Sequence, residues 1–318
     1  MKIAVIGGGS VYTPELVEGL IAHYPELPVE ELCLMDIAPE RLRIVGGLAK
    51  RMVQAAGVPI EVKMVTEIAQ ALDEADYVIL QIRVGGTAAR ILDEKIPLDF
   101  GVIGQETTGP GGFALALRTI PVALTLAHAM ENLCPRAFLI NFANPSGLVT
   151  EALLRYTRVR AIGLCNVPFG MRNMIAQWLK ASPEQLQLDY FGLNHLSWVR
   201  GVTLEGQDVF DHVFTHALEQ ARQGAYPFAS DLLEALGLLP SYYLRYYYRR
   251  DEVLAEQRRA GRTRAEEVQE IERELLDSMP ILGLPGSPRS WKSAGGLLLW
   301  LQWPCYALFT TTKGKFTS

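Results

Sequence analysis

The chain has 318 residues, of which 49% are hydrophobic and 20% are charged. This composition provides enough apolar side chains for a core in two domains or one large domain, so general disorder is excluded. A formal net charge of -5 provides no basic surface, so neither a nucleic-acid nor a membrane partner is expected. Four widely spaced cysteines without a CxxC pair indicate reduced thiols and a cytoplasmic protein. No transmembrane segment is predicted, because the apolar run at 297–309 is interrupted and too short.

The first 167 residues alternate short apolar strands with helices. Strands are expected at residues 2–6, 31–35, 60–65, 77–82, 137–142 and 161–165. Helices are expected at residues 15–23, 39–56, 68–73, 120–132 and 146–156. This alternation predicts an α/β fold, a doubly wound Rossmann-like parallel sheet that forms an NAD-binding domain over residues 1–167.

The sequence pattern changes after Pro168. A helix to Lys180, a strand pair near 188–191 and 197–203, and long helical patterns predict a mixed α+β domain over residues 168–318. This domain is expected to carry substrate, metal and oligomer contacts. The two domains together are expected to have a lactate/malate dehydrogenase-like fold. Residues 249–276 are expected to form one charged amphipathic helix with a solvated face.

A glycine turn follows the first expected strand and opens a helix. It has the first two glycines of a G-x-G-x-x-G fingerprint, with Tyr12 at the third position. Asp36 ends the second strand, where it can accept hydrogen bonds from an adenosine ribose, which favours NAD. The alternative is a tight structural turn with a helix-capping Asp. The expected cofactor-binding residues are Gly7, Gly9, Ser10, Val11, Tyr12 and Asp36.

Polar segments follow several later strands. The loop at 104–112 is rich in glycine, and could also be a flexible surface loop. The segment 141–146 lies where ligands bind in open α/β sheets, although either Asn141 or Asn144 could simply cap the next helix. Cys165 and Asn166 end the next strand at the same edge.

A thiolate and an imidazole from separate segments can hold a divalent transition ion and leave positions open for substrate oxygens. Cys165 and His195 are such a pair, although the alternative is a small buried thiol and a hydrogen-bonded structural histidine. The tyrosine-rich segment 242–248 is typical of aromatic packing on a helix, but a phenol beside an arginine or a metal could serve as a base.

Together these segments resemble glycoside hydrolase family 4, the NAD- and metal-dependent phospho-glycosidases. The matching elements are GGGSVYTPE at 7–15, Asp36, RVGGTAAR at 83–90, GQETTGPGG at 104–112, NFANP at 141–145, CNVP at 165–168, Asn194-His195 and YLRYY at 243–247. They follow the order of the family across residues 1–275.

The resemblance implies roles for individual residues. Cys165 and His195 would hold Mn(II) or a similar divalent metal ion, and Tyr243 would be the catalytic base. The implied substrate-binding residues are Arg90, Asn144, Asn166 and Arg264. Arg90, expected in the loop after the strand that ends near Ile82, and Arg264 are directed at a 6-phosphate. Asn166 resembles the β-acting members, since α-acting members carry an acid after the metal cysteine and an amide cannot act as a general acid.

The implied activity is hydrolysis of 6-phospho-β-glucosides in carbohydrate metabolism, outside the usual two-carboxylate scheme. NAD oxidises C3, Tyr243 removes the C2 proton, the aglycone is eliminated, water adds and the hydride returns. The expected substrate is a phosphorylated disaccharide or aryl-glucoside, and the expected assembly is a homodimer or homotetramer. The alternatives are an NAD-dependent 2-hydroxy acid dehydrogenase of the lactate or malate type and an inactive NAD-binding remnant.

The C-terminal tail differs from the rest of the chain. No acidic residue follows Asp277, and three of the five tryptophans, Trp291, Trp300 and Trp303, lie beyond it. We expect a truncated or altered C-terminal part from about residue 280, caused by a frameshift or premature stop.

Overall fold

The structure is a computed structural model that describes residues 1–280. These residues form two compact units. The first unit contains Met1–Leu164 and the described residues from Gly261 onward, and the second contains Cys165–Ala260. The expected domain boundary at residue 167 lies close to the end of Met1–Leu164, but the return of the chain to the first unit at Gly261 is not part of the sequence prediction.

The first unit is built on a six-stranded sheet in the order β3-β2-β1-β4-β5-β6, and all neighbouring strands are parallel. Its strands are β1 (Lys2–Ile6), β2 (Glu31–Met35), β3 (Glu61–Val65), β4 (Tyr77–Leu80), β5 (Phe138–Asn141) and β6 (Arg160–Gly163). The predicted doubly wound sheet is therefore confirmed. In this topology ligands bind beyond the carboxyl ends of the strands, where the strand order reverses between β1 and β4.

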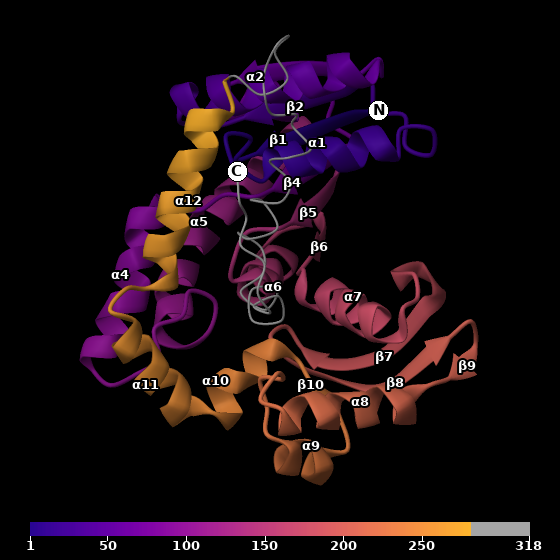
Figure 1. Cartoon of the computed structure of the whole chain (residues 1–318). Helices are drawn as coiled ribbons and strands as arrows, with labels where there is room; N and C mark the ends of the chain where they lie inside the picture. The colour runs from indigo at the N-terminus through magenta and orange to yellow at the C-terminus, as the bar shows by residue number, and fades with distance from the viewer. Residues whose placement is uncertain (281–318) are drawn as a thin grey trace. The chain divides into compact units, whose positions relative to one another are not determined.

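Helices cover both faces of this sheet (Figure 1). The helices of the first unit are α1 (Thr13–Ala22), α2 (Pro39–Ala56), α3 (Ile68–Leu72), α4 (Gly86–Asp99), α5 (Gly109–Leu133), α6 (Ser146–Tyr156) and α12 (Arg264–Ser278). Alternate strand residues point to opposite faces. Val5 and Leu34 pack with α1 and α2, and Ala4 and Cys33 pack with α3, α5 and α6.

Helix α4 corrects the prediction that Arg90 lies in a loop. Its N-cap Gly85 has φ 87°, its first residue Gly86 has φ 62°, and Pro97 lies in its last turn. Glycine and proline usually end helices, so these residues conceal the helix in the sequence. Helix α5 also begins at Gly109, earlier than expected.

The prediction of a single helix over residues 249–276 is also wrong. The structure has α11 (Arg250–Ala260) and α12, separated at Gly261, which has φ 69°. Helix α12 lies beside α4 (Figure 1) and buries Ala265 and Leu275, so it is not simply a solvated helix. Its last turn joins the core formed by α1 and α2.

The second unit is a mixed α+β arrangement, as predicted. Its elements are α7 (Val167–Leu179), η1 (Pro183–Gln185), β7 (Leu186–Leu193), β8 (Leu196–Leu204), β9 (Gln207–Asp208), α8 (Phe210–Arg222), α9 (Ser230–Leu236), β10 (Leu239–Pro240), η2 (Tyr242–Leu244), α10 (Arg245–Tyr248) and α11. The strands pair antiparallel in the order β10-β8-β7, with β9 beside β8. Ile175, Val199, Val213 and Phe228 contribute to its core.

Helix α5 is long and apolar enough to cross a membrane by length and composition, a feature that the sequence prediction did not identify. In the structure, one face of α5 is buried, and Leu126 and Met130 lie in the same cluster as Leu139 and Val149. Core helices of folded domains have this packing. The apolar run at 297–309 lies outside the described residues.

Candidate functional site

The glycine turn after β1 lies against the end of β2, as the cofactor prediction requires. Gly7 has φ 92°, and a Cβ there would lie 2.8 Å from the Gln81 carbonyl oxygen, so glycine is needed at this position. The backbone N–H groups of Gly9 and Ala38 donate to separate oxygens of Asp36, each at 2.9 Å. Because each carboxylate oxygen has a further lone pair, Asp36 can still accept a hydrogen bond from a ribose hydroxyl.

The turn continues through Ser10 and Val11 to the start of α1. The Ser10 hydroxyl accepts a hydrogen bond from the Tyr12 N–H at 3.3 Å. Val11 is buried, so its contribution to a cofactor site would come from its backbone. At the N-terminus of α1, the N–H groups of Thr13 and Glu15 donate to the carbonyls of Ser10 and Tyr12, and Pro14 has none. The positive end of the helix dipole is therefore what this N-terminus would offer a pyrophosphate.

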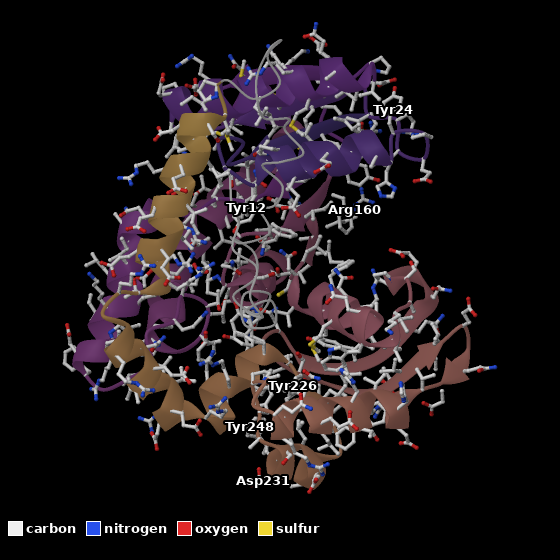
Figure 2. All side chains as sticks on the ribbon, viewed as in Figure 1. Tyr12, Tyr24, Arg160, Tyr226, Asp231 and Tyr248 are labelled. Atoms are coloured by element: carbon white, nitrogen blue, oxygen red, sulfur yellow. The ribbon has the colours of Figure 1, made fainter. Side chains whose placement is uncertain are left out.

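Tyr12, which is labelled in Figure 2, ends the glycine turn and is coupled electrostatically to charged residues of the same unit. Burial, and then the negative charge of Glu106, raises the pKa of Tyr12 to about 12, against the opposing charges of Arg90 and Arg83. The phenol is therefore protonated at neutral pH and can donate a hydrogen bond. The structure thus brings the predicted cofactor turn close to the predicted substrate residue Arg90.

Arg90 is held between two carboxylates. Its Nε lies 2.8 Å from Glu94 Oε1 and 3.1 Å from Glu106 Oε2, and its side chain is only 11% exposed. Arg83 also pairs with Glu106. Burial lowers the pKa of Arg90, but the charges of Glu106 and Glu94 outweigh this effect and raise it. The Arg90 side chain is therefore positively charged although it is largely buried.

The remaining predicted substrate residues of the first unit lie at helix starts. Arg264 is the first residue of α12, and its Nη1 lies 2.8 Å from Glu267 Oε2. Asn144 is half-buried and precedes a cis peptide bond to Pro145. Neither Asn141 nor Asn144 is the N-cap of α6, which is Pro145. Asn141 is instead fully buried and donates to Thr150 Oγ1 at 3.0 Å, a structural role.

In the second unit, Cys165 and His195 lie together. Cys165 Sγ is 3.3 Å from His195 Nε2. Metal bonds of about 2.3 Å to sulfur and about 2.05 Å to nitrogen, at angles of about 90–110°, separate two such ligands by roughly 3.1–3.6 Å. The pair therefore fits one divalent ion. No group of three His, Cys, Asp or Glu side chains with metal-binding geometry occurs in residues 1–280, so an ion here would keep positions open for substrate oxygens.

The start of α7 supplies polar contacts to the Cys165 sulfur. Burial raises the pKa of the Cys165 thiol, whereas hydrogen bonds from Val167, the Asn194 side chain and Asn166 lower it. Asn166 is the N-cap of α7, so these contacts include backbone groups at a helix N-terminus. Burial outweighs these hydrogen bonds, so the pKa of Cys165 lies above its ordinary value and the protonated thiol is favoured. A bound divalent ion would replace this proton.

His195 occupies the turn between β7 and β8. It is 6% exposed and has φ 60°, an uncommon left-handed conformation for a histidine. Gly192 supports this hairpin with φ 115°, and a Cβ there would lie 2.3 Å from the Leu196 carbonyl oxygen. Strained backbone of this kind is frequent at functional sites.

Tyr243 lies directly against His195. The two rings stack with centroids 3.7 Å apart and an interplanar angle of 5°. Tyr246 packs edge-on against Tyr243 at 5.8 Å, within the short helices η2 and α10. The structure therefore unites Cys165, Asn166, His195 and Tyr243 in the second unit, and the other predicted site residues lie in the first.

Sequence reasoning did not identify Glu94, and it singled out the loop that contains Glu106 without giving that residue a role. A sequence signal exists for Glu94, because it follows Arg90 by four residues, which places both on one helical face. This four-residue spacing indicates a contact only in a helix, and the sequence analysis expects a loop around Arg90.

The fold and the clustered side chains define an α/β enzyme with a Rossmann-like unit and a thiol–imidazole–phenol site. A family 4 glycosyl hydrolase model matches residues 2–181, and the model of the family's C-terminal domain matches residues 190–294. The chain belongs to glycosyl hydrolase family 4 and is a glycosidase.

Similar proteins agree with this assignment. A probable 6-phospho-β-glucosidase of Bacillus subtilis strain 168 is 46% identical over 308 residues, which cover 93% of this chain and 70% of the relative. A solved 6-phospho-β-glucosidase of Thermotoga maritima, with manganese, NAD+ and glucose 6-phosphate, has a TM-score of 0.84 and 36% identity, covering 95% of this chain and 70% of that one. The predicted NAD and manganese are thus bound by this relative.

A malate dehydrogenase of Salinibacter ruber has a TM-score of 0.51 and 16% identity, covering 76% of this chain and 72% of that one. This likeness concerns the fold alone. The predicted resemblance to the lactate and malate dehydrogenase fold is confirmed at that level.

Proposed function

We propose that the chain is a 6-phospho-β-glucosidase that uses NAD and a divalent ion such as Mn(II). The observation that carries the proposal is the cluster in the second unit, where Cys165 Sγ lies 3.3 Å from His195 Nε2 and the Tyr243 ring stacks on His195. The similarity to a probable 6-phospho-β-glucosidase of Bacillus subtilis and the glucose 6-phosphate in the Thermotoga maritima structure support the substrate class.

The chain contains residues that would bind NAD, the metal ion and the phosphorylated sugar. The glycine turn and Asp36 would hold NAD, and Cys165 with His195 would hold the metal. Arg90 and Arg264 would bind the 6-phosphate, since arginine presents a planar fork that matches phosphate oxygens. Asn144 and Asn166 would contact the sugar.

In the proposed reaction, bound NAD would accept hydride from C3 while the C3 hydroxyl proton passes to solvent, and it would later return the hydride as a proton is taken back. A metal held by Cys165 and His195 would polarise the C3 carbonyl and so acidify the C2 proton. Tyr243 removes the proton from C2. The C1–O bond then breaks as C1 and C2 become doubly bonded, and the aglycone oxygen leaves with the bonding electron pair and takes a proton from water. Tyr243 returns a proton to C2 when water adds its hydroxyl to C1. The net change is hydrolysis without net oxidation.

Asn166 supports the β-specific assignment. It lies beside Cys165 at the N-cap of α7, and its amide has no proton that it could transfer to a leaving oxygen. Within the resemblance to the family, this residue type accompanies β-acting members.

Substrate selectivity tests the proposal. We expect p-nitrophenyl 6-phospho-β-glucoside to be hydrolysed, and the 6-phospho-α-glucoside and the unphosphorylated β-glucoside to have far lower kcat/KM values. Preference for the α-linked substrate would contradict the role of Asn166. Equal turnover of the unphosphorylated substrate would contradict the phosphate-binding roles of Arg90 and Arg264.

We further propose a cytoplasmic location, since the phosphorylated substrates are made inside the cell by phosphorylating uptake systems, and assembly as a homodimer or homotetramer. Light scattering coupled to size-exclusion chromatography measures the assembly directly. A monomer at enzyme concentrations used in the assay would contradict it.

A further inference from the structure

Glu94 is a buried carboxylate in α4 that joins two elements far apart in the sequence. Its side chain is 4% exposed, and each of its oxygens has its own donor. Oε1 accepts from Arg90 Nε at 2.8 Å, and Oε2 accepts from the Ala265 backbone N–H at 2.8 Å. Both partners belong to the first unit, like Glu94 itself.

The second donor lies in the first turn of α12, next to Arg264. The helix N-cap, Thr263, forms a capping box with Glu266, in which the Thr263 N–H donates to Glu266 Oε2 at 2.8 Å. Glu94 satisfies a further N–H group of this helix end, where a negative charge is also favourable. Glu94 therefore fixes the backbone position of the segment that carries Arg264.

We propose that Glu94 is a positioning residue for recognition of the 6-phosphate: it holds Arg90 and the start of α12, with Arg264, at a fixed separation. This inference rests on the proposed function. Among the described residues, the shortest contacts of Arg90 to both Glu94 and Glu106 are made by Nε. The Nη groups are therefore the atoms through which Arg90 meets a phosphate.

A carboxylate is needed at this position because two donors from different elements require two acceptor atoms. An amide has one acceptor oxygen, and its NH2 group would face the second donor. In Glu94→Gln, one of the two contacts is lost. The guanidinium of Arg90 retains Glu106 as its charged partner, and we expect it to shift toward Glu106.

The test is steady-state kinetics of Glu94→Gln with p-nitrophenyl 6-phospho-β-glucoside in the presence of NAD and Mn(II). We expect KM to rise about 10- to 100-fold and kcat to change less than about threefold, because the displaced groups bind the phosphate and not the reacting atoms. The affinity for NAD should match that of the wild type. An unchanged KM would overturn the proposal.

Asp93→Asn is the matched control. Asp93 is 6% exposed in the same helix and pairs with Arg118, whose Nη1 donates to Oδ1 at 3.1 Å. It does not share the contact of Glu94 with α12. We expect this variant to lose stability while KM stays near the wild-type value. An equal rise of KM in both variants would overturn the proposal, because it would indicate a general effect of disturbing α4.

Glu94→Asp serves if Glu94→Gln does not fold. The aspartate side chain keeps the charge but is one methylene shorter, so it cannot reach both donors. We therefore expect KM to rise in this variant too. A wild-type KM would overturn the proposal. In the wild-type enzyme, glucose 6-phosphate should slow amide hydrogen exchange in α4 and at the start of α12 together, and protection of neither segment would count against it. Wild-type protein without activity would instead mean that the proposed function has failed.

Discussion

The proposed chemistry depends on three side chains from separate segments of the second unit. Cys165 precedes α7, His195 lies in the β7–β8 turn and Tyr243 lies in η2. Their contacts, 3.3 Å between Sγ and Nε2 and 3.7 Å between the ring centroids of His195 and Tyr243, assign them complementary tasks. Two would bind a metal, and the third would move a proton beside it.

Replacing Tyr243 by Phe should remove the base while the stacked ring is retained. We expect kcat to fall by about 10²- to 10⁴-fold, the usual contribution of general base catalysis, with NAD binding intact. Exchange of the C2 hydrogen with deuterated solvent should also stop. Tyr247→Phe is the control, since Tyr247 is 54% exposed in the same segment, and it should behave as the wild type. Undiminished C2 exchange in Tyr243→Phe would rule out its role as base.

Replacing Cys165 by Ser should weaken metal binding. A hydroxyl is a far poorer ligand than a thiolate for transition ions, so we expect the Kd for Mn(II) to rise at least about tenfold. Calorimetric titration with Mn(II) measures this directly. Cys134→Ser, which changes a buried thiol of the first unit, should leave Mn(II) affinity unaltered. Equal affinities of wild type and Cys165→Ser would place the metal elsewhere.

At the scale of the elements, helix α12 follows the second unit in the sequence but is not part of that unit. It belongs to the first unit and buries Leu275 to 1% exposure in the core with α1 and α2. We expect Leu275→Ala to lower the free energy of unfolding by about 2–5 kcal/mol. Glu274→Ala, at an exposed position of the same helix, should change it by less than about 0.5 kcal/mol. Urea denaturation compares the two, and similar small effects would show that α12 is not part of the core.

The neighbouring strands β1, β2 and β3 provide a pH-dependent contribution to stability through Lys2, Glu31 and Lys63. Burial alone would raise the pKa of Glu31, but hydrogen bonds from Lys63, at 2.6 Å, and Lys2 outweigh it, so the pKa lies below its ordinary value. A depressed pKa stabilises the folded state above the pKa of the unfolded chain, and this contribution disappears as the pH falls through the folded value.

Glu31→Gln should therefore lower the free energy of unfolding by at most about 1 kcal/mol at neutral pH. The difference from wild type should vanish at a pH well below the ordinary carboxyl pKa of about 4.3. Denaturation curves across this range provide the test. Glu61→Gln, 67% exposed and 3.6 Å from Lys63, should have a smaller effect throughout. A difference that grows as the pH falls would contradict the assignment.

The sequence predicts elements well where local periodicity and burial agree. The strands at 2–6 and 31–35 and the helix at 39–56 have the expected bounds, because apolar runs and helical spacing there coincide with the core. Helix α4 is missed because Gly85, Gly86 and Pro97 oppose helix formation locally, whereas packing against α5 and α12 stabilises it.

The candidate site is predictable to a similar extent. Cys165 and His195 can be paired from their residue types, but the stacking of Tyr243 on His195 depends on tertiary structure. The bridge from Glu94 to Ala265 spans 171 residues of sequence, so no local pattern could indicate it.

At the scale of the whole molecule, the two units carry different parts of the proposed machinery. The first contains the glycine turn with Asp36 and the charged cluster around Arg90, and the second contains the thiol, imidazole and phenol. The chain covers 70% of the length of the Bacillus subtilis relative, and the family's C-terminal model matches up to residue 294. The altered tail expected from about residue 280 lies outside the described residues.

The central claim is that the chain couples reversible redox chemistry to glycoside cleavage. It is tested most directly by removing bound nucleotide and metal, then measuring p-nitrophenol release from p-nitrophenyl 6-phospho-β-glucoside while following NADH absorbance. We predict that release requires both NAD and Mn(II), and that NADH does not accumulate as the product forms. Cleavage without either addition, or one NADH formed per product, would contradict the account.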